Sequence, residues 1–487
     1  MTWCGTGYSP SDRQATTIYA LPEDVLLDIF FCYKEGCKRY HSSSYWAGEW
    51  HLLVHICQRW RQLVFASPLR LDLQILCTAG TPVGKNLGIW PALPIYVHFG
   101  GSHRWNGNNA HSEDNIATAL EHVGRVCNVD LLVWHSELEK ITRAMQKPFP
   151  VLKTLYIHLT DGTEPLLPGE FLGGSAPRLQ EIYLEGVPFL ALPTLLLSTS
   201  DLVRLYLCCI PQSGHISPEA MVVGLAALPR LRLFVIMFQS ASPRPDQVHP
   251  PPITRTVLPA LTHFEFEGAN EYVEDFVARI DAPQLNRIYI EYIDLLVDFR
   301  VAQLPIFMDR SVGLKSTQFR YTEVTFESNM ITFRAYSRPN HSSPDQPYVQ
   351  TSVVCGGLGR QVLHIAQVVS HVSATISNVV HLEFVVQLQR YRQLRQLEGT
   401  DDVEWLHLFH QFSAVQTLRV SHKLAGHVAL ALESITGETV AEALSSLDLI
   451  YLADQPASSI GKFVAARCLS DHPITVVETL MEFEKKT

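Results

Sequence analysis

A short phrase recurs along this chain and constrains its fold more than any other feature of the sequence. The phrase reads Pro-x-Leu-x-x-apolar-x-apolar, and its copies start roughly 23–30 residues apart, a spacing typical of repeat proteins. One such unit is too small to bury its own apolar residues, so the pattern predicts stacked units rather than one globular core. The copies begin at Pro150, Pro177, Asp201, Pro229, Pro259 and Pro283, and weaker copies begin at Val379, Ser413 and Leu444.

Each copy predicts a short strand followed by a return segment. The alternating apolar residues at the end of the phrase indicate a strand with one buried face. Residues 112–127 and 136–146 have helical spacing and are expected to be return helices. Earlier strands are expected at about residues 69, 93 and 129. The repeat weakens between about residues 312 and 375, where the polar, proline-rich segment 336–348 is expected to be an inserted surface loop.

The residues between the apolar positions of each strand are expected to point outward. If the strands are parallel and in register, these residues form one concave face with tyrosines beside carboxylates. Tyrosine is enriched at protein interfaces, and carboxylates favour a basic partner, so we expect this face to bind a Lys- or Arg-rich protein segment. The alternative is that these residues are merely solvated. The candidate binding residues are Tyr156, Tyr183, Glu185, Tyr206, Glu265, Glu267, Tyr289 and Glu291, and His158, Glu383 and Arg419 are expected on the same face.

A different pattern occupies residues 18–68, where two apolar helices are expected. Pro22 suits the first turn of a helix, and the acidic residues after it suit a helix N-terminus. Apolar residues at helical spacing then run to Tyr33 and, after a segment from Phe31 to Glu49 expected to be a loop, from Trp50 to Val64. A unit of this size has only a marginal core, so its apolar stripes are expected to be covered by the rest of the chain or by a partner.

The sequence LPEDVLLDIF, followed by LVHICQRWRQLVFASP, resembles an F-box. Together with SPLRLDLQILCT, WPALPIYVHF and the later IGKFVAARCLSDHPITV, it resembles fungal F-box-like proteins that have leucine-rich-repeat-like C-terminal regions. This resemblance implies docking on the Skp-type subunit of a cullin–RING ubiquitin ligase, with substrate held by the remainder of the chain. The segment from Phe31 to Glu49 is longer than a compact F-box usually has. By position, the implied docking residues are Leu21, Pro22, Val25, Leu26, Ile29, Phe30, Val54, Cys57, Trp60 and Leu63.

Composition narrows the remaining functions. The net charge of −10 disfavours generic nucleic-acid binding, which needs a basic surface. The ten cysteines include no CxxC pair, so zinc ribbons and redox dithiols are unsupported. No secretory signal pattern begins the sequence, and no apolar run reaches the ~18 residues of a membrane-spanning helix. We therefore expect a cytoplasmic or nuclear protein with reduced thiols and no membrane partner.

Several short motifs resemble chemical sites, and each has a simpler interpretation. His51 and His55 share a helix but lack a third metal ligand, so they are expected to be core or surface histidines. The glycines of CGGLGR, residues 355–360, lack the lysine of a phosphate-binding loop and predict a turn or helix entry. Cys208 and Cys209 are expected to be small buried residues.

The acidic segment EGTDDVEW, residues 398–405, lacks the spacing of a calcium loop, and Asp402 is expected to cap the following helix. No GxSxG or other catalytic motif is visible. The sequence therefore predicts a protein that is not an enzyme and has no cofactor or metal.

Taken together, these features predict an α/β chain in three parts. They are a flexible tail (1–17), an F-box-like helical domain (18–68) and a leucine-rich-repeat-like solenoid (69–487) with a curved sheet and return helices. The expected function is a non-catalytic adaptor that recruits substrate to a Skp–cullin–F-box ligase by raising its effective concentration. The alternative is a repeat scaffold that binds proteins without a ligase link, in which residues 20–67 cap the solenoid.

Overall fold

The computed structural model describes residues 18–40, 50–80, 83–89, 92–100, 112–161, 166–240, 254–293, 301–338, 346–387, 402–434, 444–453, 460–469 and 472–479. The expected tail, residues 1–17, and the centre of the expected inserted loop, residues 339–345, lie outside the described residues. The chain divides into two compact units, Met1–Leu131 and Leu132–Thr487.

The first unit begins with three helices, which follow a short 3-10 turn at Ile18–Ala20: α1 (Glu23–Tyr40), α2 (Trp50–Ile56) and α3 (Gln58–Ala66). Their apolar side chains pack together, and the ring centroids of Phe30 and Trp60 lie 4.6 Å apart. The buried ammonium of Lys34 donates hydrogen bonds to the carbonyl oxygens of Leu71 and Asp72, at 2.6 and 2.5 Å. This lysine therefore fastens α1 to the chain that follows α3.

These helices differ from the sequence prediction in two ways. The loop expected from Phe31 was placed too early, because α1 continues to Tyr40. The polar residues of that segment are mostly Lys, Glu and Arg, which are good helix formers. The helical stripe expected from Trp50 to Val64 is divided at Cys57, whose extended backbone and side chain cap α3, with Sγ accepting the N–H of Trp60.

Three parallel strands complete the first unit: β1 (Ile75–Cys77), β2 (Ile95–Phe99) and β3 (Val126–Val133), whose last two residues begin the second unit. Helices α4 (Val83–Ile89) and α5 (Ser112–Leu120) connect them. The strands expected near residues 93 and 129 are thus present. The return helix expected at 112–127 ends at Leu120, because its last residues, Val126 and Cys127, begin β3. The strand expected near residue 69 is wrong, because residues 68–72 form turns and β1 starts only at Ile75. The indole N–H of Trp50 donates to the carbonyl oxygen of Gln74 at 2.7 Å and so joins the helices to β1.

The second unit is built on a long, mostly parallel sheet. Its strand order is β4-β5-β6-β7-β9-β11-β14-β13-β12-β15-β16-β17-β18. Before the inserted strands of residues 321–354 the strands are β4 (Thr154–Leu159), β5 (Glu181–Glu185), β6 (Arg204–Ile210), β7 (Leu233–Phe238), β9 (His263–Gly268) and β11 (Arg287–Tyr292). After the inserted strands they are β15 (His381–Val386), β16 (Thr417–Val420), β17 (Leu449–Ala453) and β18 (Thr475–Thr479).

These strands form where the repeated phrase predicts them, because the phrase encodes one buried face. In β4, β9 and β11 buried and half-buried residues alternate without exception. The inward side chains stack from strand to strand, as Phe234 and Phe264 do at 5.8 Å between ring centroids. Outside the main sheet, β8 (Thr256–Val257) and β10 (Ile280–Asp281) form a separate parallel pair.

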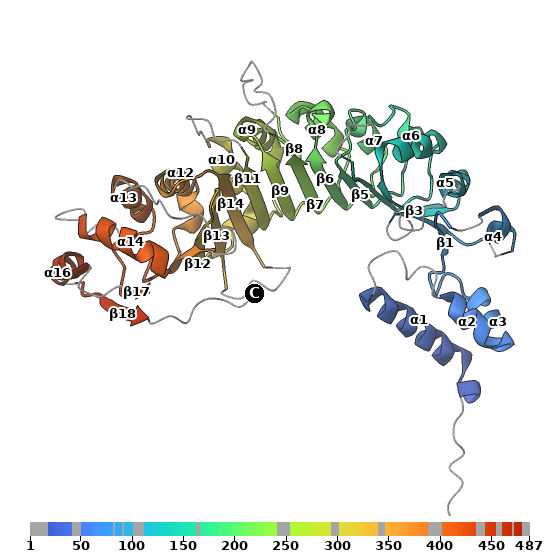
Figure 1. Cartoon of the computed structure of the whole chain (residues 1–487), viewed down its shortest axis with the longest axis horizontal. Coiled ribbons are helices and arrows are strands. Elements are labelled where there is room, and N and C mark those ends of the chain that lie inside the picture. Colours follow the sequence, from blue (N-terminus) through green and yellow to red (C-terminus); the bar gives the residue numbers. More distant parts are fainter. Residues whose placement is uncertain are drawn as a thin grey trace, which may run out of the picture. The chain divides into compact units, whose positions relative to one another are not determined.

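Return segments connect the strands, and in Figure 1 helices α6 to α9 lie along one face of β4 to β11. Between β4 and β5 the return contains the short 3-10 segment Phe171–Gly174, and Gln212–Gly214 forms another before α8. The helices up to β11 are α6 (His135–Ala144), α7 (Leu192–Leu196), α8 (Pro218–Leu225) and α9 (Asn270–Ala278). Those beyond it are α10 (Gln303–Arg310), α11 (Val312–Lys315), α12 (Leu358–Ile376), α13 (Asp402–His410), α14 (His422–Ser434) and α16 (Gly461–Leu469). The predicted α/β solenoid is therefore confirmed for the second unit.

The stretch in which the repeat weakens contains an insertion that the sequence did not predict. Strands β12 (Tyr321–Phe326), β13 (Met330–Tyr336) and β14 (Tyr348–Val354) lie within the sheet, and β13 is antiparallel to both of its neighbours. The polar segment expected as a loop connects β13 to β14. The insertion thus continues the sheet instead of interrupting it.

Two of the smaller predictions have clear outcomes. Gly357 precedes α12 with φ of 84°, a left-handed conformation that favours glycine, so the glycine-rich motif is a helix entry as expected. The expectation that Cys208 and Cys209 are buried is wrong. Cys208 is half-buried and Cys209 is exposed with φ of 50°, where the register shifts between Leu207 and Ile210. Helix α13 begins at Asp402, but the capping side chain lies outside what the structure describes.

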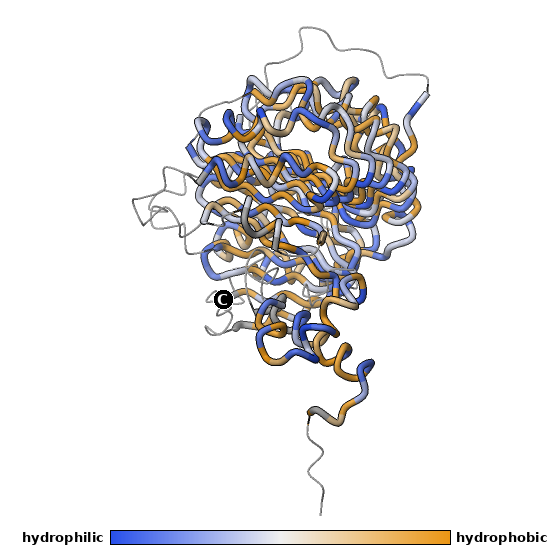
Figure 2. The backbone as a smooth tube through the Cα atoms, turned by 90° about the vertical axis from the view of Figure 1, so that its right-hand side faces the viewer, coloured by the Kyte–Doolittle hydropathy of each residue, from blue (hydrophilic) through white to orange (hydrophobic). Residues whose placement is uncertain are grey.

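Figure 2 shows hydrophobic and hydrophilic residues interspersed along the tube. Among the described helices, none combines the length and the apolar content needed to cross a membrane.

Candidate functional site

The ten residues implied in docking separate into a buried set and an accessible set. Leu26, Phe30, Val54, Trp60 and Leu63 are buried within the chain, and Phe30 of α1 packs against Trp60 of α3. Val25 and Ile29 are 38 % and 41 % exposed. Leu21 and Cys57 are half-buried and Pro22 is exposed. Only part of the predicted set is therefore accessible to a partner.

An exposed apolar row remains on α1 after its core is formed. Val25, Ile29 and Tyr33 are spaced by four residues, so they lie on one side of the helix, and each is at least 38 % exposed. On α2, Leu52 and Ile56 have the same spacing and are more than half exposed. Clustered exposed apolar side chains are a feature of interaction surfaces.

The second candidate site is the face of the long sheet that carries the predicted tyrosines, which we call the tyrosine face. Strand pairing places Tyr156, Tyr183 and Tyr206 in one row, and the row continues in the pairing order Val235, Glu265, Tyr289, Gln350, Arg334, Glu323, Glu383, Arg419 and Tyr451. Two residues further along the strands, His158, Glu185 and Cys208 pair in one row, and Met237, Glu267, Glu291 and Ser352 pair in another. The register shift between Leu207 and Ile210 separates these two rows. The outward residues named from the sequence thus lie in register.

The tyrosines at one end of this face form a ladder. The ring centroids of Tyr156 and Tyr183 lie 5.9 Å apart, and those of Tyr183 and Tyr206 lie 5.7 Å apart. Burial raises the pKa of all three phenols above the ordinary value, and nearby carboxylates raise it further. The rings are therefore neutral hydrogen-bond donors with partly accessible faces, which suits contact with another polypeptide or with a cationic side chain.

Some carboxylates of the tyrosine face have partners within the chain. Glu181 is nearly buried and forms an ion pair with Arg204 of the next strand. Glu185 accepts a hydrogen bond from the Tyr183 hydroxyl at 2.5 Å and lies 2.7 Å from His158 Nδ1. Both carboxylates of β5 therefore have a partner within the chain.

The carboxylates on β9 and β11 have no such cations. None of the ion pairs between described residues involves Glu265, Glu267 or Glu291, although Glu291 accepts a hydrogen bond from Tyr289. Glu267 and Glu291 lie directly opposite each other. Burial, followed by repulsion from Glu291, raises the pKa of Glu265, and burial with both neighbouring carboxylates raises that of Glu267 to about 6.

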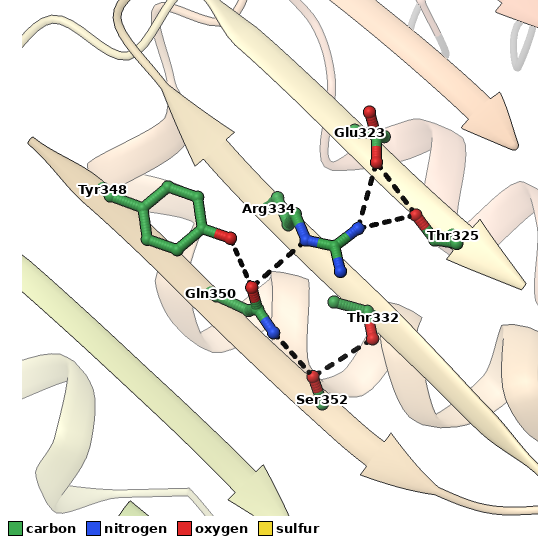
Figure 3. A network of polar contacts seen from close by, with 7 residues as sticks. All are labelled: Glu323, Thr325, Thr332, Arg334, Tyr348, Gln350 and Ser352. Atoms are coloured by element: carbon green, nitrogen blue, oxygen red, sulfur yellow. Dashed lines mark hydrogen bonds and ion pairs between the residues drawn. The ribbon is translucent and has the colours of Figure 1, made fainter. Parts of the chain in front are cut away.

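The same face carries a polar network where the insertion joins the sheet (Figure 3). The guanidinium of Arg334 donates to Glu323 at 3.0 Å, to the Thr325 hydroxyl at 2.9 Å and to Gln350 Oε1 at 3.1 Å. Gln350 also accepts from Tyr348 and donates to Ser352, which contacts the Thr332 hydroxyl at 3.1 Å. The network therefore joins all three inserted strands. Beside it lies a hollow of about 330 Å³ lined by Arg287, Glu323, Arg334, Tyr336, Gln346, Pro347 and Tyr348.

Apart from Arg419, sequence reasoning missed the arginines of this face. Arg204 and Arg287 occupy the outward position just before the predicted tyrosines Tyr206 and Tyr289, so the same alternation could have located them. Arg334 could not be located in this way, because β13 lacks the repeated phrase. Within the described ranges no three His, Cys, Asp or Glu side chains are placed to hold a metal ion.

Comparison with known proteins adds little to this geometry. No protein-family model matches the chain, and no curated protein matches it. Among solved structures, the chain is similar to the leucine-rich repeat-containing protein LegL7 from Legionella pneumophila. The identity is 12 %, the match covers 75 % of this chain and 95 % of that chain, and the TM-score is 0.27. At this TM-score the similarity carries no argument, and the description of the fold rests on the strand pairing of the chain itself.

Proposed function

We propose that this chain is a protein-interaction scaffold whose tyrosine face binds a basic polypeptide segment. The observation that carries the proposal is the group Glu265, Glu267 and Glu291, three carboxylates without cations beside a ladder of tyrosines. Crowded carboxylates repel one another in the free chain, and a bound cation would relieve this repulsion. Lysine or arginine side chains would supply the cation, and the tyrosine rings would supply contact area and cation–π attraction.

A binding assay with matched peptides tests this proposal. An arginine-rich peptide should bind the full chain, and the same peptide with citrulline in place of arginine should not, because citrulline has similar shape but no charge. Replacing Glu265, Glu267 and Glu291 together with glutamine should weaken arginine-peptide binding by about tenfold or more. Replacing Glu433 with glutamine is the control, because that residue lies on α14. Equal binding of both peptides would reject the proposal.

The proposal extends to the resemblance of the N-terminal helices to an F-box. In this extension the exposed row Val25, Ile29 and Tyr33 docks on a Skp-type subunit of a cullin–RING ligase, and the tyrosine face brings the substrate. The exposed apolar side chains support it, since a stripe of this kind needs a partner to cover it. No residue of the chain would then perform chemistry.

Co-expression with a Skp-type protein tests the extension. The structure directs the choice of variants, because Leu26 is fully buried and Leu26→Asp would unfold the helices with or without a ligase. Val25→Asp and Ile29→Asp alter the exposed row and should abolish co-purification while thermal unfolding stays unchanged. Co-purification that survives both substitutions would reject this docking row.

A second function is favoured by a specific observation. Lys34 and Trp50 donate hydrogen bonds to backbone carbonyls of residues 71–74, which lead into β1, as residues of a solenoid cap would. A scaffold with no ligase link is therefore the competing proposal, and it predicts that the unmodified chain captures no Skp-type protein.

A further inference from the structure

Strand β11 places a cation, Arg287, on the tyrosine face beside the carboxylates. Its side chain is half-buried, and among the described residues its single hydrogen bond joins Nη1 to His263 Nε2 at 3.4 Å. None of the described ion pairs includes it, and its Nε is buried without an acceptor. An arginine is always charged, and a buried N–H donor without an acceptor costs free energy. The position therefore lacks an anion.

The hollow beside Arg287 has room for that anion. Its volume of about 330 Å³ lies at the lower end of the range for ligand sites. Arg334, on the hollow's wall, uses Nε and Nη1 in the polar network, and none of the hydrogen bonds in the described part of the chain uses its Nη2. Two guanidinium groups and the Glu323 carboxylate leave the hollow with one net positive charge.

The charge balance favours a carboxylate over a phosphate. One carboxylate would neutralise the hollow, and its two oxygens match the planar fork of a guanidinium. A phosphate carries about −1.5 to −2 charges and would be repelled by Glu323 on the same wall. The rings of Tyr336 and Tyr348 leave a partly apolar wall against which the methylene groups of an acidic side chain can pack.

We propose that this hollow binds an aspartate or glutamate side chain of a polypeptide that lies along β11. The basic residues of the same polypeptide would then lie over Glu291, Glu267 and Glu265, so this inference deepens the proposed function and relies on it for the direction of the bound segment. Arg287 and Glu291 are four positions apart on one strand, which corresponds to about 13 Å. The acidic and basic groups of the partner are therefore spaced by about four residues of extended chain.

Three labelled peptides and the full chain provide the test, with binding followed by fluorescence anisotropy. The first peptide has glutamates and arginines about four residues apart. The second has glutamine in place of glutamate, and the third has citrulline in place of arginine. Arg287→Ala should weaken the binding of the first and third peptides by about ten- to thirtyfold and leave the affinity for the second peptide unchanged. For the first and third peptides, the affinity of Arg287→Lys should lie between those of the unmodified chain and Arg287→Ala, because lysine keeps the charge but lacks the planar fork of the guanidinium.

Controls make the result specific to the hollow. Arg143→Ala removes an exposed arginine of α6, away from the tyrosine face and the hollow, and it should change no affinity. Arg287→Gln keeps most of the side-chain volume and replaces the alanine variant if thermal unfolding shows that alanine disturbs the fold. Equal affinity of the unmodified chain and Arg287→Gln for the first peptide would overturn the inference.

Two further outcomes separate this inference from the proposed function. If the second peptide fails to bind but the third binds in an Arg287-dependent way, the basic-segment proposal fails while the carboxylate site stands. If phosphoserine in place of glutamate binds far more tightly, the site is a phosphate site and the inference is overturned.

Discussion

Two stretches of the tyrosine face use charge in opposite ways. On β9 and β11, Glu267 and Glu291 face each other across adjacent strands, and no cation of the described chain neutralises them. On the inserted strands, Arg334 is held by Glu323, Thr325 and Gln350 (Figure 3). Both stretches lie in the same sheet, and the two rows of side chains continue from one into the other.

Under the proposed function, one stretch serves stability and the other serves binding. On the inserted strands, Glu323, Arg334 and Gln350 bond to one another and to neighbouring hydroxyls, so their network stabilises the sheet in the free chain. The carboxylates of β9 and β11 oppose folding slightly, because they are partly desolvated and repel one another. An arrangement that costs stability in the free chain is typical of sites that a partner completes.

The largest effect is expected where the network is broken. Arg334→Ala removes three hydrogen bonds and leaves the Glu323 carboxylate, whose side chain is 13 % exposed, without its cation. The free energy of unfolding should fall by about 2–3 kcal/mol, measured by urea unfolding followed by circular dichroism. Arg230→Ala, which breaks an exposed ion pair with Asp201, should cost no more than about 1 kcal/mol. Similar losses in the two variants would mean that the network contributes no more than a surface pair.

The contrast between the stretches also separates what the sequence could and could not predict. The regular strands were predictable because alternating apolar residues after Pro-x-Leu directly encode one buried face. The inserted strands lack that entry phrase and bury polar residues such as Thr322, Thr332 and Ser352, which hides the apolar alternation. In the helices, the polar residues from Lys34 onward predict a loop, but α1 continues through them to Tyr40.

The tyrosine face was likewise predictable only in part. Register follows from the repeat, so the tyrosines and glutamates could be assigned to one face. Which carboxylates have partners could not be predicted, because Glu181 meets Arg204 only through strand pairing across 23 residues of chain. Likewise, which side chains of the N-terminal helices are buried depends on how α1 packs on α3, since Leu26 and Val25 are neighbours in sequence but opposite in burial.

Replacing one of the unpaired carboxylates should have a smaller effect on the free energy of unfolding than Arg334→Ala, and it should raise this free energy instead of lowering it. Glu267→Gln removes the like-charge contact with Glu291 and should raise the free energy of unfolding at pH 7 by about 0.2–1 kcal/mol. Glu185→Gln is the matched variant on β5. It should lower stability, because Glu185 accepts from Tyr183 and pairs with His158. A loss of stability in both variants would show that the two carboxylates are equally well satisfied and would remove the contrast between paired and unpaired groups.

The smallest effect is the pH dependence of the stability that Glu267→Gln adds. The folded chain raises the pKa of Glu267 to about 6 from 4.5, so this carboxyl favours folding fully below pH 4.5, and its contribution is lost as pH rises through 6. The stability difference between Glu267→Gln and the unmodified chain should therefore be near zero at pH 4.5 and reach its full value above pH 7. Because the carboxyl is only partly buried, the change should amount to a few tenths of a kcal/mol, resolved by paired urea titrations at each pH. A difference that stays constant from pH 4.5 to 7.5 would show that the gain comes from packing of the amide, since a charge effect must vanish once the carboxyl is protonated.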